Sequence, residues 1–493
     1  MNHFDIDKNA ETEISHKKFT FGEEVWLPKE SNDLYFDVAI VGGGPGGIFA
    51  ALELSQKPLK IVLLDKGCAI EKRIGKCISA CGSCKICHIT HGLGGAGLFS
   101  DGKCRSSFNI SKYFGTDYDC TGIANGITES IVKDCNKLNI NINQKNPSID
   151  TVSKTKKELK SLGLDFTYFP VKHLGSDASV VFTKYLIDKL YTKGVSIKEN
   201  SEVVEITKGN EEYELLLRNN GTYSKISAKY IVLSVGKSGT SWLNEQTEKL
   251  KINVDQPKLF MGIRIETNQR ITKKLTDLSF DPKISMHMEN RDYVKTHCWC
   301  EGGHIMSCNY QGLILLGGHA FLNEKSNNTI FALLSSFEVP KEKTLYDYSY
   351  QLIKNINERG SGKILLQRLD DFINRDNTTV AKIENHAVSP TLKNFNINRI
   401  DLILPNRIYF NLKDFILRLN KFCPGLIEEG LVYAPALEWW SQNVLVTQKF
   451  EANVKNIYII GEASGIAKGI IGSATTGILA ASDILSKIEN NLN

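Results

Sequence analysis

A glycine-rich segment near the N-terminus is the feature that most constrains the fold. Residues 38–47 read VAIVGGGPGG, so an apolar run ends at the pattern Gly42-x-Gly44-x-x-Gly47. In a strand–turn–helix unit, the first glycine allows a tight turn and the second lets the backbone approach a pyrophosphate. The third glycine lets the helix pack closely on the strand. The sequence therefore predicts a dinucleotide site at this turn.

The residues on either side of the turn agree with this prediction. Apolar stretches predict strands over residues 36–41 and 60–65 and a helix over 48–54, whose N-terminus offers N–H groups and a positive dipole end to phosphates. The second strand ends on Asp65, at the spacing where an acid can accept hydrogen bonds from the adenosine ribose. The alternative is a glycine-rich loop that binds nothing.

Composition and charge limit the number of domains and the classes of partner that we expect. The chain has 493 residues, 42% of them hydrophobic, and a net charge of +5, which fits two or three ordinary globular domains. The lysines at 154–160 alternate with other residues and predict a solvated helix face, so no nucleic-acid partner is expected. No apolar run is long enough to predict a membrane span, and residues 1–29 lack the apolar core of a signal peptide. Twelve cysteines without such a signal favour a reducing, cytoplasmic location.

The order of predicted elements gives the architecture. We expect an α/β protein: a Rossmann-like FAD-binding domain interrupted by an inserted α+β substrate domain. The expected boundaries are an N-terminal arm over 1–33, the first part of the FAD-binding domain over 34–244, the insertion over 245–440, and the rest of the FAD-binding domain over 441–493.

The C-terminal segment favours a flavin over a nicotinamide cofactor. A strand of apolar residues ends at Gly461 and Glu462, and a glycine-rich helix follows residue 468. In an FAD fold such an acid can bind a ribityl hydroxyl, and the helix N-terminus can face the flavin edge where negative charge gathers on reduction. No second strand–GxGxxG–helix unit is present, so a separate NAD(P)H domain is not expected.

Three segments together resemble a known family. Residues 41–47, 94–103 (GGAGLFSDGK) and 456–481 are similar to the FAD-dependent dehydrogenases of the glutathione-reductase-2 structural class, which are distant relatives of flavoprotein fumarate reductases and geranylgeranyl reductases. Residues 235–239 and 298–303 extend the similarity. The resemblance implies that residues 94–100 pass beside the flavin and pyrophosphate and that Val204 contacts the adenine. Glu462 departs from the aspartate of many flavoproteins.

Motifs and resemblance together define a set of candidate cofactor-binding residues. They lie in the first glycine turn, at the end of the second strand, in the 94–100 segment and near the C-terminal glycines. The set is Gly42, Gly44, Pro45, Gly46, Gly47, Asp65, Lys66, Gly94, Gly95, Ala96, Gly97, Leu98, Ser100, Val204, Gly236, Gly461, Glu462, Gly469 and Ile470.

A cysteine cluster lies between two of these segments. Cys77, Cys81, Cys84 and Cys87 fall within a cysteine-rich loop over 77–91, a density of thiols that suits one iron–sulfur cluster or one zinc ion. A thiol–disulfide redox pair and inert thiols are the alternatives. The loop lies in sequence between Asp65 and Gly94, so a metal there would be near the flavin and could pass it single electrons.

Candidate substrate-side residues lie in the expected insertion. Arg264 and Glu266 share one face of a predicted strand, where Arg264 could hold a substrate carboxylate. The alternative is that the two are ordinary surface or salt-bridge groups. Cys298 and His304 lie in the segment HCWCEGGH and are candidate acids, thiols or proton donors, although a plain strand and glycine turn would have the same sequence.

These observations predict a soluble FAD-dependent oxidoreductase that transfers hydride between the flavin and a small organic molecule. Arg264, Cys298 and His304 are its candidate catalytic residues, and a donor protein or NAD(P)H would supply electrons. One alternative is a flavoenzyme that acts on RNA or another macromolecule. A second alternative is a non-enzymatic redox or metal sensor.

Overall fold

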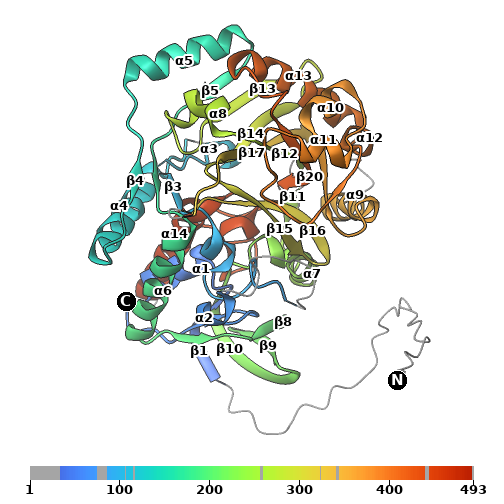
Figure 1. The fold of residues 1–493 in the computed structure, drawn as a ribbon. Helices are drawn as coiled ribbons and strands as arrows, with labels where there is room; N and C mark the ends of the chain where they lie inside the picture. The colour runs from blue at the N-terminus through green and yellow to red at the C-terminus, as the bar shows by residue number, and fades with distance from the viewer. Residues whose placement is uncertain are drawn as a thin grey trace, which may run out of the picture.

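The structure is a computed structural model that describes residues 34–74, 86–105, 107–114, 117–255, 259–321, 324–339, 344–438 and 443–490. The expected N-terminal arm and most of the cysteine-rich loop lie outside these residues. Two sheets organise the chain. In Figure 1 the first sheet lies with α1 and α6 in the lower part of the molecule, and the second sheet lies in the upper part with α8, α10 and α13.

The first sheet confirms the expected Rossmann-like α/β unit. Its strand order is β7-β2-β1-β10-β9-β8, and β22 also pairs with β10. Strands β7, β2, β1, β10 and β22 run parallel, whereas β8, β9 and the first part of β10 form antiparallel pairs. The strands are β1 (Leu34–Val41), β2 (Ile61–Leu64), β7 (Ser196–Lys198), β8 (Glu202–Lys208), β9 (Tyr213–Asn219), β10 (Thr222–Leu233) and β22 (Ile457–Ile459).

Alternation along β1 gives this sheet two apolar faces, as expected for a buried parallel strand. Val38 and Ile40 face a core shared with helices α1 (Pro45–Leu54), α6 (Ser176–Thr192) and α14 (Gly469–Asn490). Ala39 and Val41 face the opposite core, which includes residues of β8, β9 and α7 (Thr240–Leu250). The sheet is therefore covered on both sides, and its carboxyl-terminal edge carries the predicted glycine turns.

The second sheet is mainly antiparallel and has the order β19-β18-β20-β12-β17-β14-β13-β5. Its core includes residues of α8 (Gln269–Thr276), α9 (Leu345–Arg359), α10 (Leu369–Asn374) and α13 (Asn406–Phe422). One of its edge strands, β5, precedes residue 245, so this sheet also draws on the chain ahead of the predicted insertion. The strands are β5 (Asp165–Thr167), β12 (Leu259–Asn268), β13 (Lys283–His287), β14 (Tyr293–Glu301), β17 (Asn328–Phe337), β18 (Ile364–Arg368), β19 (Phe395–Ile397) and β20 (Leu431–Glu438).

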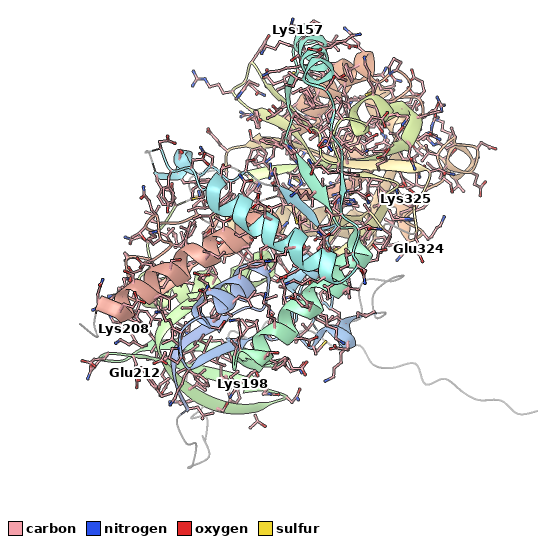
Figure 2. All side chains as sticks on the ribbon, turned by 90° about the vertical axis from the view of Figure 1, so that its left-hand side faces the viewer. Lys157, Lys198, Lys208, Glu212, Glu324 and Lys325 are labelled. Atoms are coloured by element: carbon pink, nitrogen blue, oxygen red, sulfur yellow. The ribbon has the colours of Figure 1, made fainter. Side chains whose placement is uncertain are left out.

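Shorter elements connect the two sheets and cover their edges. They are α2 (Ile70–Arg73), η1 (Gly95–Phe99), β3 (Lys103–Arg105), α3 (Ser111–Phe114), α4 (Thr121–Lys137), β4 (Asn143–Gln144), α5 (Ile149–Ser161), β6 (Val171–His173), η2 (Lys237–Gly239), β11 (Val254–Asp255), β15 (His304–Tyr310), β16 (Leu313–His319), α11 (Val380–Glu384), α12 (Ile400–Ile403), β21 (Asn443–Val444) and η3 (Gly461–Ser464). Lys157 of α5 projects from the outer end of the molecule in Figure 2 and is exposed, which confirms the predicted solvated face.

Helix α14 is the one helix among the described residues that is long and apolar enough to cross a membrane, by length and composition alone. Its contacts explain its composition in another way. An added Cβ at Gly477 would lie 2.3 Å from the carbonyl oxygen of Gly46, so α14 and α1 are packed backbone to backbone. Small and apolar residues are what such a contact between two core helices requires.

Candidate cofactor and active site

The first glycine turn has the geometry that its motif predicts. Gly42 has a φ of +107°, and an added Cβ would lie 2.3 Å from the carbonyl oxygen of Ser234, which directly follows β10. An added Cβ at Gly47 would lie 2.1 Å from the carbonyl oxygen of Gly42. Gly44 is the N-cap of α1 and Pro45 follows it, so no side chain caps the first N–H groups of the helix. These N–H groups can donate hydrogen bonds to a phosphate.

Asp65 joins two loops at this turn. Its carboxylate accepts hydrogen bonds from the backbone N–H groups of Gly43 at 2.9 Å, Gly67 at 2.8 Å and Gly92 at 2.9 Å. A carboxylate offers about four acceptor positions, so one remains for a ribose hydroxyl. The predicted ribose role is therefore compatible with a structural role that the sequence did not reveal. Burial lowers the pKa of the adjacent Lys66.

Three of the predicted cofactor segments meet at the start of α1. The N–H of Gly94 donates to the carbonyl of Gly43 at 2.8 Å. Added Cβ atoms at Gly95 and Gly97 would lie 2.9 Å from the Cα of Gly44 and 2.8 Å from the Cγ of Pro45, respectively, and Ile470 lies 3.9 Å from the second position. Leu98 is buried, Ala96 is exposed, and the hydroxyl of Ser100 donates to the carbonyl of Gly97 at 2.8 Å.

Arg73 was missed by sequence reasoning, yet it organises this loop. The side chain is 1% exposed and donates to the carbonyl oxygens of residues on both sides of Gly92. The acceptors are His88 at 2.8 Å, Ile89 at 2.9 Å, Gly92 at 3.2 Å, Leu93 at 2.5 Å and Gly95 at 2.8 Å. Burial lowers the pKa of Arg73 to about 10. In the sequence Arg73 is one charge in the short stretch IEKR, which carries no signal for this role.

The remaining predicted positions leave room for a flavin nucleotide. Gly236 and Gly469 have φ values of +62° and +66°, and an added Cβ at either would meet nothing within 4 Å. Gly461 also has a positive φ, at the end of β22. A bulge in the ladder between β8 and β9 falls at Val204, whose carbonyl accepts a hydrogen bond from Trp242 Nε1 at 2.9 Å. These glycines and the helix N-terminus fit FAD, although the positions that would bind it stay a prediction.

Glu438, at the end of β20, binds two lysines and a histidine, one lysine from just before α14 and the other two side chains from β14. Its carboxylate pairs with Lys295 of β14 at 2.7 Å, with His297 Nε2 at 3.4 Å and with Lys468, which directly precedes α14. Burial would raise the pKa of Glu438, but Lys468, His297 and Lys295 hold it well below its usual value. Burial also lowers the pKa of His297 to about 3, so this imidazole is neutral at pH 7.

Glu462 lies close to this group. Burial raises the pKa of Glu462, and Lys237 and Lys468 oppose the rise. The ammonium of Lys237 donates to the carbonyl of Leu437 at 2.9 Å and lies over the ring of Tyr310. A buried acid beside two lysines can hold a hydroxyl group of a ligand, which is the role predicted for Glu462.

A second polar group follows the 94–100 segment directly. Lys103 Nζ lies 2.5 Å from Asp101, and the thiol of Cys300 lies 3.4 Å from the same carboxylate. Burial alone would lower the pKa of Lys103, but Asp101 raises it above its ordinary value. Burial raises the pKa of Cys300 to about 12, so this thiol stays protonated. Lys283 pairs with Asp281 at 2.6 Å, and Asp281 Oδ1 accepts from the N–H of Trp299 at 3.4 Å.

Two of the three predicted catalytic residues lie in this region. Cys298 sits in a bulge of β14 against β17 with a φ of +51°, a rare conformation for a side chain other than glycine and one that concentrates at functional sites. Its sulfur lies 4.0 Å from His297 Nε2. Burial raises the pKa of Cys298, and the positive charge of Arg264 opposes the rise.

Arg264 and Glu266 are not the ordinary surface or salt-bridge groups that were the alternative for them. Arg264 is 5% exposed and Glu266 is fully buried. Glu266 accepts hydrogen bonds from Tyr433 Oη at 2.5 Å, Thr391 Oγ1 at 2.7 Å and Asn328 Nδ2 at 2.8 Å. The carboxylate is thus satisfied without Arg264, and that alternative is wrong.

His304, the third predicted catalytic residue, lies on the two-stranded sheet of β15 and β16. It begins β15 opposite His319 of β16, and its Nε2 is 3.0 Å from the carbonyl of Glu324. Figure 2 places Glu324 and Lys325 at the side of the molecule. His319 is more enclosed, and burial lowers its pKa to about 4. The glycine-flanked His319 carried a weaker sequence signal than His304.

Of the four predicted metal ligands, the structure describes Cys87. Cys77, Cys81 and Cys84 lie outside the described residues. Cys87 is 7% exposed and packs with Ile89 and Cys308. Within the described ranges, no group of three or more His, Cys, Asp or Glu side chains is arranged to hold a metal ion.

Comparisons with known proteins found distant similarity. No family model matches the chain. An uncharacterized protein of Clostridium beijerinckii is 22% identical over 475 residues, which cover 91% of this chain and 81% of that protein. A flavoprotein/dehydrogenase from Cytophaga hutchinsonii is 11% identical with a TM-score of 0.40, and the match covers 92% of this chain and 79% of that one. For glycine oxidase from Geobacillus kaustophilus the identity is 11%, the TM-score 0.40 and the coverages 92% and 95%. These scores are too low to assign an activity.

Proposed function

We propose that this protein is an FAD-dependent oxidoreductase that acts on a small organic molecule. The observation that carries the proposal is the convergence of residues 42–47, 94–100 and 469–470 at the carboxyl-terminal edge of a parallel sheet, which is where such sheets bind ligands. The glycine contacts tolerate no side chain at Gly42 or Gly47, so the turn is built for close backbone approach.

The residues of the chain have separable tasks in this proposal. The N-terminus of α1 binds the pyrophosphate, Asp65 and Val204 hold the adenosine half, and Glu462 holds a ribityl hydroxyl. Bound FAD would supply the hydride chemistry. The N-terminus of α14 offers its positive dipole end on the side where Glu438 and Glu462 lie, and Lys468 pairs with Glu438 there, although burial lowers the pKa of Lys468.

The side chains of the second sheet would handle the substrate. Cys300 is kept protonated by burial and can hold a proton, and His297 is neutral and can accept a hydrogen bond. Cys298 presents a second thiol at a bulge on the same strand. The polar groups described above come from the second sheet and from segments at the edge of the first sheet, so substrate would bind between the two sheets. The buried faces of β12 and β14 would exclude water there.

We also propose that Cys77, Cys81, Cys84 and Cys87 hold an iron–sulfur cluster or zinc. The support is their spacing in the sequence and the position of Cys87, which is buried shortly before the 94–100 segment. An iron–sulfur cluster would let a donor protein deliver single electrons. Cys104, Cys120, Cys135 and Cys423 are free thiols, which supports a reducing compartment such as the cytoplasm.

The test of this function is a spectrum of protein purified without oxygen, with flavin, iron, zinc and sulfide assayed on the same sample. We expect flavin absorbance bands with about one FAD per chain, and iron with sulfide or zinc in comparable amount. The double variant C81S/C84S should lose the metal and keep the flavin. Failure to bind FAD on reconstitution would overturn the proposed function, whereas FAD without metal would overturn only the metal site.

A further inference from the structure

Arg264 is a buried cation that forms no ion pair with any residue that the structure describes. The side chain is 5% exposed, and its Nε and Nη1 atoms have no hydrogen-bond partner among the described residues. No carboxylate within the described ranges forms an ion pair with it, and Glu266 on the same strand is committed to other donors. Burying a charged group without a partner is costly, and proteins rarely do so unless a ligand completes the site.

The surroundings of Arg264 hold the guanidinium in place. An added Cβ at Gly318 would lie 2.3 Å from Arg264 Nη1 and 3.1 Å from Cζ, so this glycine of β16 makes room for the planar group. The positive charge of Arg264 acts on the pKa values of Cys298, Cys300 and His319. Arg264 therefore faces the same thiols that are proposed to handle the substrate.

The charge balance of the region favours an anion. Basic side chains outnumber carboxylates among the described residues of this region. The basic side chains are Lys103, Lys237, Lys283, Lys295, Lys468 and Arg264, and the carboxylates are Asp101, Asp281, Glu266, Glu438 and Glu462. Burial lowers the pKa of Lys237 and of Lys468, so these two lysines add less positive charge than Arg264. The lysines are engaged with carboxylates or carbonyls, as in the pairs of Lys103 with Asp101 and of Lys283 with Asp281. Arg264 is the cation of this set whose donors are left for a ligand.

We propose that Arg264 binds the carboxylate of a small organic acid, which makes the substrate class of this enzyme a carboxylate. This inference rests on the proposed function, since it places the acid beside the flavin-facing residues. Nε and Nη1 belong to different edges of the guanidinium, so a carboxylate can pair with the group along either edge. Cys298 and Cys300 are close enough for the charge of Arg264 to act on both thiols, so a bound carboxylate would lie in their neighbourhood.

The test compares matched ligands on matched variants. The probes are acetate, propionate and benzoate against acetamide, propionamide and benzamide, which have similar shape and no charge. The readouts are the melting temperature of the flavin-free and FAD-loaded full-length chain and the difference spectrum of the bound flavin. Arg270→Gln is the control, because Arg270 is an exposed arginine on the neighbouring helix α8 that pairs with Glu429.

We expect a saturable response to carboxylates and none to the amides. Arg264→Gln should weaken carboxylate binding at least tenfold, Arg264→Lys should weaken it less, and Arg270→Gln should leave it unchanged. Gly318→Ala should also weaken it by displacing the guanidinium, which keeps the test decisive if the Arg264 variants do not fold. Equal responses to acids and amides, no response in the wild type, or full binding by Arg264→Gln would overturn the inference. FAD content measured on the same samples separates this failure from failure of the proposed function.

Discussion

At the scale of single residues, the nucleotide turn depends on two positions that have no side chain. Gly42 and Gly47 lie so close to neighbouring carbonyl oxygens that a methyl group at either would need the backbone to move. Backbone atoms cannot rotate away as a long side chain can. A methyl group at either position would therefore displace β1, α1 and β10 relative to one another. In the same way, the missing side chain at Gly318 leaves space for the guanidinium of Arg264, the group that is proposed to bind the ligand.

Replacement of Gly42 by alanine tests the first exclusion. We expect Gly42→Ala to lower the free energy of unfolding by about 2 kcal/mol or more and to abolish FAD retention, because both the positive φ and the contact with Ser234 oppose it. The control is Gly126→Ala on the exposed face of α4, where an added Cβ meets nothing within 4 Å. That variant should gain about 0.5–1 kcal/mol. Chemical denaturation and flavin absorbance measure both effects, and retention of FAD by Gly42→Ala would contradict the assigned turn.

At the scale of elements, one side chain ties a helix end to a loop. Arg73 ends α2 and donates to carbonyl oxygens between His88 and Gly95, so the loop before η1 is held from inside. The adjacent Asp65 holds the N–H groups of the same loop and of the glycine turn. Backbone donors and acceptors of one loop are thus paired with a carboxylate and a guanidinium that reach it from opposite sides.

Loss of the guanidinium should loosen this loop more than the rest of the protein. We expect Arg73→Met to weaken FAD binding by at least tenfold and to expose residues 86–95 to limited proteolysis, because several buried carbonyls would lose their donor. Arg73→Lys should have an intermediate effect, since one ammonium cannot reach as many acceptors as the planar fork. Arg218→Met is a suitable control, because Arg218 is half-exposed and pairs with Glu202 on the β8–β9 hairpin. Equal protease patterns for wild type and Arg73→Met would contradict this role.

At the scale of the whole molecule, burial sets the response to pH. Burial lowers the pKa of His91 and His297 to about 3 and that of His173 and His319 to about 4. The unfolded chain binds protons at these histidines below about pH 6.5, whereas the folded chain does not until the pH is far lower. The folded state therefore loses stability as the pH falls from about 6.5 towards 4.

We expect the free energy of unfolding to be clearly lower at pH 5 than at pH 7.5, by about 2 kcal/mol for His173 alone. His173 is the best single probe because it is 6% exposed, stacks on Phe280, and has no hydrogen-bond partner for Nε2 within the described chain. His173→Gln should make the decline between these pH values shallower. Urea denaturation at a series of pH values measures it, and a stability that does not change over this range would show that these histidines are accessible to protons in the folded state.

The sequence by itself determined the nucleotide turn and the elements around it. The pattern of Gly42, Gly44 and Gly47 between apolar runs predicted β1, α1 and β2, because the spacing of glycines and the alternation of apolar residues act through local geometry. The partners of β10 are a different matter, because this one long strand pairs with β9 and then with β1 and β22. A strand that changes partners has no local signature.

Only the tertiary structure decided which polar side chains meet. The pair of Lys468 and Glu438 depends on how the second sheet lies against the edge of the first, and the nearness of Arg264 to Cys298 depends on the order of strands within the second sheet. The sequence showed that Arg264 lies on a strand, but its burial without a partner follows from Gly318 and from the engagement of Glu266 elsewhere. Side-chain pairing at long range is set by packing of whole elements, and a single sequence carries no periodic or spacing signal for it.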